Sequence, residues 1–232
     1  MATVSLDHLA HLRRELATVE RYLDADLSVP IEHCGDWTLY DLVDHIGGGN
    51  LWAAVAVTEQ RGNHKPPPAP RDPADLVTWF RGTSDTLLAA LEADPGTPAW
   101  TFFPPHTVGF WRRRRSLETL VHRWDLEHAL GIDHDVDPML ASDGVAEVID
   151  TMVPRMVRRG RLVAPEQAVR LAATDTGMSW VLGPGDPAGE VSGTAADLLL
   201  MLWGRLPRDH EAISWAGDRE AVRAVLSRQL VP

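Results

Sequence analysis

The sequence has a single cysteine and fewer basic than acidic residues, and each shortage excludes a class of protein. Cys34 is the single cysteine among 232 residues, so no disulfide can form within the chain. This usage fits a reducing compartment, and we expect a cytoplasmic protein. Lys65 is the only lysine among 22 basic residues, which face 33 acidic ones and give a net charge of −11. A phosphate backbone would repel that charge, so no nucleic-acid partner is expected.

Long apolar runs are missing as well. No segment approaches the roughly 20 apolar residues of a membrane-spanning helix, so no membrane partner is expected. The opening stretch "MATVSLDHLAHLRRELATVERYL" is charged and amphipathic, and it lacks the apolar core of a signal peptide. The remaining composition, 44% hydrophobic and 24% charged, is ordinary for a globular protein with one large domain or two modest ones.

The first two thirds of the chain have the periodicity of helices. Leucine and valine recur at spacings of three and four over residues 5–25. Thr38 and Asp41 form a capping box that starts a second helix, expected to end near residue 62. The proline-rich stretch "GNHKPPPAPRDP" that follows cannot be helical. Three more helices are predicted, over residues 73–93, 113–130 and 140–159.

The character of the sequence changes after residue 160. Four short runs predict strands: "QAVRLAATD", "MSWVLGP", "GEVSG" and "AISWAG". The segments "TAADLLLMLWGR" and "DREAVRAVLSRQL" predict two helices among them. We therefore predict an α+β protein, with a helical bundle over residues 1–162 and a small α+β domain over residues 163–232.

Five ionisable groups lie close together in "SLETLVHRWDLEHALG", residues 116–131. Each residue of an α-helix advances by about 100°. With Glu118 as the origin, His122 lies about 40° and Asp125 about −20° around the helix axis, so these three share one face. His128 lies at about −80° and Glu127 on the opposite side of the helix, so neither residue belongs to that face.

Glu118 and His122 are helix neighbours that can reach one ion, but a catalytic site needs three protein ligands and an open position. His45 is the best third candidate, because it lies within a predicted helix just before glycines that leave space. The prediction is a two-histidine, one-carboxylate metal site across two helices, with Asp125 orienting His122 or an arginine. The alternative is a chance spacing on an ordinary helix face, with a half-buried histidine at position 45.

Other polar residues are assigned no ligand role. The run Arg112–Arg115 is predicted to be a mostly exposed face, from which one or two side chains could turn inward to hold an anionic substrate. Cys34 has no base partner in the sequence and is a poor nucleophile candidate. The loops hold four further histidines: His33, His64, His106 and His134.

Two of these segments resemble motifs of the mycothiol-dependent maleylpyruvate isomerase family, which has a DinB-like metal-binding bundle. "DWTLYDLVDHIGG" is similar to the family's "GWT-x-x-DL-x-x-H" segment. "FWRRRRSLETLVHRWDLEHALG" is similar to its "R-x-x-x-E-x-x-x-HR-x-D-x-x-x-A-x-G" segment. The C-terminal "LAATDTGMSWVL" and "VSGTAADLLLMLWGRL" resemble the family's sterol-carrier-like domain. The resemblance implies an up-down-down-up four-helix bundle followed by a small α+β domain.

The resemblance also implies a chemistry. His45, Glu118 and His122 would bind a divalent metal, most often Zn²⁺, and mycothiol would be the thiol cosubstrate. A metal-bound thiolate would attack a small-molecule electrophile, either as a cis–trans isomerase of the maleylpyruvate type or as an S-transferase. The family's C-terminal arginine maps to Arg205, which could hold a carboxylate of an anionic substrate. Arg205 and Asp125 are the predicted catalytic residues, although Arg205 could equally serve a helix end.

A second hypothesis is a non-catalytic protein that retains a metal and binds a small molecule or lipid. The aromatic stretch "WTFFPPHTVGFW" would then line its pocket. The sequence leaves two properties open. A monomer and a homodimer are equally compatible with it, and a histidine–carboxylate site accepts zinc, iron, nickel or copper.

Overall fold

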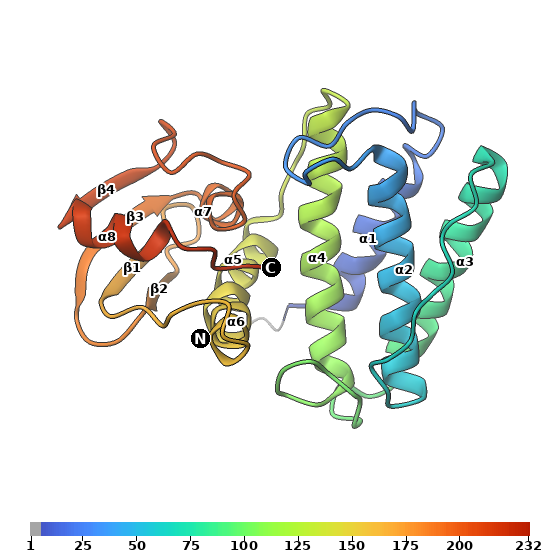
Figure 1. The fold of residues 1–232 in the computed structure, drawn as a ribbon, viewed down its shortest axis with the longest axis horizontal. Coiled ribbons are helices and arrows are strands. Elements are labelled where there is room, and N and C mark those ends of the chain that lie inside the picture. The colour runs from blue at the N-terminus through green and yellow to red at the C-terminus, as the bar shows by residue number, and fades with distance from the viewer. Residues whose placement is uncertain (1–5) are drawn as a thin grey trace. The chain divides into compact units, whose positions relative to one another are not determined.

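The protein, described here as a computed structural model over residues 6–232, forms two compact units. The first ends at Asp135 and is helical, and the second runs from Val136 to Pro232 and contains a sheet (Figure 1). This division comes earlier than the boundary expected near residue 162. The reason is helix α5 (Pro138–Glu147), which packs on α7 (Ala195–Leu202) within the second unit.

Four helices build the first unit: α1 (His8–Glu20), α2 (Leu39–Thr58), α3 (Pro73–Leu91) and α4 (Val108–Ala129). The predicted capping box is present at α2, where Thr38 and Asp41 bond each other's backbone N–H groups. Helix α1 is shorter than the predicted range 5–25, and residue 5 lies outside the described residues. Helix α4 begins at Val108 rather than near residue 113, so the end of the aromatic stretch is helical.

The helices have the up-down-down-up order that the resemblance implied. Helix α1 packs on α3 and α4, and α2 packs on the same two helices. Figure 1 shows α1 and α4 running in one direction and α2 and α3 in the other. The proline-rich segment between α2 and α3 returns along the length of the bundle, which allows these two helices to be parallel.

Apolar side chains from all four helices fill the centre of the bundle. Leu12, Ile46, Phe80 and Trp111 are at most 1% exposed, and each contributes roughly 1.5–3 kcal/mol through burial. Because α2 and α4 are antiparallel, the first half of α2 lies beside the second half of α4. This packing places residue 45 opposite residues 118 and 122.

The second unit is a four-stranded sheet with helices. Its strands are β1 (Ala168–Ala173), β2 (Ser179–Leu182), β3 (Pro187–Gly193) and β4 (Ser214–Gly217), in the order β2-β1-β3-β4. The central pair β1 and β3 is parallel, and both outer pairs are antiparallel. Its helices are α5, the π-helical η1 (Val148–Met152), α6 (Val153–Arg158), α7 and α8 (Arg219–Leu226). The four strands, with α7 before β4 and α8 after it, match the sequence prediction.

Among the described residues, no helix combines the length and the apolar character that a membrane crossing requires.

Candidate metal centre

His45 from α2 meets Glu118 and His122 from α4, and these three residues are called the inner site below. Their ligand atoms all lie within 4.8 Å of one another. His45 Nε2 is 3.3 Å from Glu118 Oε1, and the two imidazole rings are 5.0 Å apart in an edge-on arrangement. The structure therefore brings together the three residues that the sequence singled out.

Asp125 fixes the orientation of His122. The Nδ1 atom of His122 lies 3.1 Å from Asp125 Oδ2, and the carboxylate accepts the hydrogen bond. Asp125 is buried, at 2% exposure. A histidine held in this way through one ring nitrogen has the other, Nε2, available for a metal. The contact predicted between Asp125 and His122 is present.

Two arginines contact the carboxylate oxygen of Glu118 that does not face His45. Arg115 is 1% exposed, and its Nη1 donates to Glu118 Oε2 at 2.6 Å. Its Nη2 donates to the Ile46 carbonyl at 3.0 Å and to Asn50 Oδ1 at 2.8 Å. Arg114, also buried, places its Nε 3.6 Å from Glu118 Oε2. Two side chains of the run thus turn inward, as the prediction allowed, and both hold the Glu118 carboxylate.

These contacts decide the protonation states of the site. Burial alone would raise the pKa of Glu118, but the Arg115 and Arg114 guanidiniums, together with a smaller contribution from His45, outweigh it and hold that pKa well below its ordinary value. Burial lowers the pKa of His122, and the hydrogen bond to Asp125 opposes this only in part. The site thus offers a carboxylate and a neutral imidazole, the forms that metal ligation requires.

A cavity of about 450 Å³ opens beside His45 and Glu118. Its apolar lining is Trp52 with Pro66, Pro67 and Pro68, and its polar lining includes Asp44, His45, Arg115 and Glu118. The proline-rich connector is held as a wall at Ala69, whose N–H donates to Asp44 Oδ1 at 2.7 Å and whose carbonyl accepts from Tyr40 Oη at 2.6 Å. The site therefore has room for small molecules next to the ligand atoms.

Two sequence profiles match the chain. The mycothiol maleylpyruvate isomerase N-terminal domain matches residues 9–127, which is half of the chain, and the MDMPI C-terminal domain matches residues 139–224. This chain belongs to the mycothiol maleylpyruvate isomerase family. The solved fold agrees. The crystal structure of the mycothiol-dependent maleylpyruvate isomerase is similar with a TM-score of 0.65 at 16% identity, over 90% of this chain and 91% of that one.

Further relatives extend the comparison. A histidine-to-alanine mutant of the same isomerase is similar with a TM-score of 0.63 at 15% identity, over 90% of this chain and 91% of its own. Two uncharacterized proteins of Mycobacterium tuberculosis, from strains CDC 1551 / Oshkosh and ATCC 25618 / H37Rv, are each 30% identical over 141 residues. Those matches cover 58% of this chain and 71% of each relative.

In this family member the segment before α2 also contacts the site, which the sequence did not indicate. Cys34 Sγ lies 3.6 Å from Asp125 Oδ2, so the thiol contacts the residue that orients His122. The Trp37 ring lies 4.9 Å from the His45 ring. Both residues belong to a turn far from α4 in the chain, and no local pattern marks such a long-range contact.

Other predicted residues have different surroundings. Glu127 bonds Arg123, and His128 lies beside Glu32, so neither joins the inner site, as the helix angles indicated. The aromatic stretch packs against Trp52, with the Trp111 ring 5.0 Å from it. Arg205 belongs to the second unit, where its Nη1 donates to the Trp203 carbonyl at the end of α7 at 2.8 Å. This is the helix-end contact considered above, and a role in the site stays a prediction for Arg205.

Gly49→Ala is expected to weaken metal binding. A Cβ there would lie 2.6 Å from Arg115 Nη1, and this buried guanidinium cannot move without loosening Glu118. We expect a loss of about tenfold in metal affinity, the scale seen when a residue supporting a ligand is lost.

Gly48→Ala is the matched control, because its nearest neighbour would be Pro66 Cγ at 3.4 Å. It should keep the affinity and gain up to about 1 kcal/mol of stability from helix propensity. Metal titration and urea unfolding of both variants check the pair, and equal affinities would contradict the role given to Arg115.

Proposed function

We propose that this chain is a mycothiol-dependent enzyme whose reaction requires a divalent metal held by His45, Glu118 and His122. The convergence of these three side chains beside an accessible cavity carries the proposal. Two imidazoles and one carboxylate suit Zn²⁺, with a further coordination position left for a ligand. Membership of a family whose solved relative is a mycothiol-dependent isomerase supports the thiol as cosubstrate.

The residues of the chain prepare the site for that chemistry. A bound dication lowers the pKa of a thiol that coordinates it and so supplies a thiolate at neutral pH. Arg115 and Arg114 keep Glu118 ionised. Asp125 bonds Nδ1 of His122 and so leaves its Nε2 available to the metal. Trp52 and the prolines give the cavity beside these groups an apolar wall.

The proposed reaction is the isomerisation of an anionic substrate of the maleylpyruvate type. The thiolate of mycothiol adds to an activated double bond, the resulting single bond rotates, and the thiolate leaves. If the adduct instead takes up a proton from solvent and remains as a thioether, the same first step gives an S-transferase. Arg205 is the proposed partner of a substrate carboxylate, through paired hydrogen bonds. Mass spectrometry of the products distinguishes a regenerated thiol from a stable thioether.

Metal removal tests the proposal. Untagged protein is assayed with mycothiol and maleylpyruvate before and after chelation, and again after Zn²⁺ is added back. We expect turnover that needs mycothiol, falls to background in the metal-free protein and returns with Zn²⁺. Circular dichroism of the metal-free protein shows whether the bundle is intact. Full turnover by an intact, metal-free protein would exclude the metal from the reaction.

A further inference from the structure

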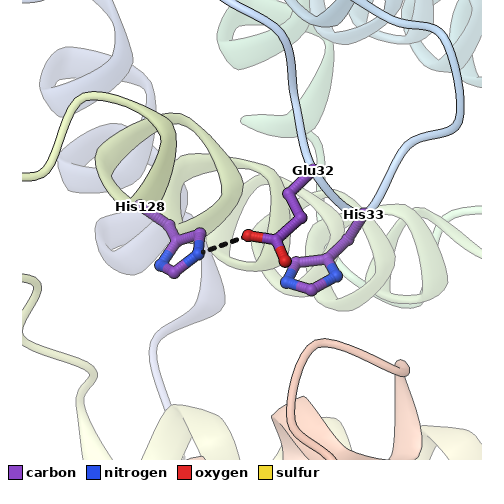
Figure 2. Close-up of side chains that lie close together, drawn as sticks. All are labelled: Glu32, His33 and His128. Atoms are coloured by element: carbon purple, nitrogen blue, oxygen red, sulfur yellow. Dashed lines mark hydrogen bonds and ion pairs between the residues drawn. The ribbon is translucent and has the colours of Figure 1, made fainter.

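We propose a second metal site on this chain, called the outer site, formed by Glu32, His33 and His128. Two imidazoles and one carboxylate supply ligand atoms that all lie within 4.8 Å of one another. Figure 2 shows the Glu32 carboxylate between the two rings, with His128 coming from the end of α4 and the other two residues from the turn before α2. The site would take a borderline divalent cation such as Zn²⁺, Ni²⁺ or Cu²⁺.

The ligand atoms already face one another. His128 Nε2 lies 3.1 Å from Glu32 Oε2, and the His33 and His128 rings are 5.7 Å apart. A cation bound here would take the place of this contact between the histidine and the carboxylate. The side chains of His128 and Glu32 are 41% and 68% exposed, so an ion can reach them from solvent.

Buried neighbours hold both parts of the outer site. The His128 ring stacks on Trp124 at 4.7 Å and 9° between planes, and Trp124 is 5% exposed. On the other side, Ile31 is 1% exposed, and its N–H donates to the Trp37 carbonyl at 2.8 Å. The Cys34 N–H donates to the Ile31 carbonyl at 3.1 Å, which closes the turn that carries the other two ligands. The His128 ring and the backbone that carries the other two ligands therefore lose little conformational freedom when an ion binds.

The ligand types select the cation. Imidazole nitrogen suits zinc, nickel and copper, whereas calcium and magnesium require oxygen ligands. The outer carboxylate is well solvated, while Glu118 of the inner site is held by the buried Arg115. We therefore expect the outer site to bind the same cations more weakly than the inner site.

Titration of the metal-free, untagged full chain with Ni²⁺ alone tests this inference by calorimetry. We expect two equivalents, of which the weaker is lost in His128→Ala and weakened at least about tenfold in Glu32→Gln. The matched control is His106→Ala, an exposed histidine just before the start of α4, about 30 Å along that helix from residue 128. It should bind like the wild type.

A further variant distinguishes metal binding at the inner site from metal binding at the outer site. His122→Ala should lose the tighter equivalent and keep the weaker one, so that failure of the inner site leaves the outer site testable. Glu32→Gln changes one exposed side chain and guards against a folding defect in His128→Ala. A wild-type protein that binds a single equivalent, which is lost in His122→Ala and kept in His128→Ala, would overturn the proposal. The same holds if His33→Ala/His128→Ala keeps the second equivalent at wild-type affinity.

Discussion

His122→Ala is expected to lose the metal of the inner site and more than about 100-fold in turnover. Asp125→Asn should lose about 10- to 100-fold in metal affinity, because it removes the residue that orients His122 but keeps the ligand itself. Metal content per chain and kcat/KM with mycothiol check both. The control is His106→Ala, the same change at an exposed histidine outside both sites, which should keep the metal content and the turnover.

The choice of pH separates the effect of Asp125 on His122 from competition between protons and the metal for this imidazole. Burial lowers the pKa of His122, while Asp125 raises it in part. In the wild type, protons therefore compete with the metal for His122 only below the ordinary imidazole pKa of about 6.5. Asp125→Asn removes the raising contribution, so its imidazole is even harder to protonate.

Affinities at pH 7.5 thus compare neutral imidazoles in both proteins and report the support that Asp125 gives to His122, without competition from protons. An Asp125→Asn protein with wild-type affinity at this pH would contradict the supporting role of Asp125.

The parts of this molecule that the sequence predicted are those that local geometry decides. The angles between Glu118, His122 and Asp125 follow from the pitch of one helix, so their common face needs no knowledge of the fold. The capping box at Thr38 and the strand patterns of the second unit are equally local. His45 could be chosen as the third ligand candidate because the glycines after it leave room on its helix.

The parts that were missed depend on packing between distant segments. Helix α4 is buried around most of its surface, and no apolar stripe in its sequence shows which way Arg115 points. The periodicity of residues 140–159 predicts a helix but not which unit it packs on. His33 was assigned only to a loop, and its approach to His128 depends on how the turn before α2 lies against α4.

Arg123→Met is expected to destabilise the bundle by about 3–5 kcal/mol, because it leaves two buried carboxylates without a counter-charge. Arg123 bonds Glu15 of α1 and Glu127 of α4, and its Nη2 donates to the Asp135 carbonyl at 2.8 Å. These three charged residues are each between 4% and 7% exposed. Urea unfolding of the variant and the wild type measures the difference.

The deficit should shrink as the pH falls. Burial raises the pKa of Glu15 and of Glu127 above the ordinary 4.5, and Arg123 is the main group that opposes this. Without Arg123, both pKa values rise further. A carboxyl with a higher pKa in the folded state binds protons more tightly there, so stability is regained as the pH drops through that raised value toward 4.5. Unfolding at pH 5.5 should therefore show a smaller deficit than at pH 7.5.

Two controls separate charge burial from the loss of a contact. Arg81→Met breaks an exposed ion pair between α3 and Glu20 of α1, where Arg81 is 60% exposed, and should cost less than about 1 kcal/mol. Glu15→Gln/Arg123→Met/Glu127→Gln removes all three charges and should recover most of the stability lost in Arg123→Met. If Arg123→Met costs no more than Arg81→Met, the buried charges do not hold α1 against α4. The position of α4, which carries Glu118 and His122, would then rest on apolar packing alone.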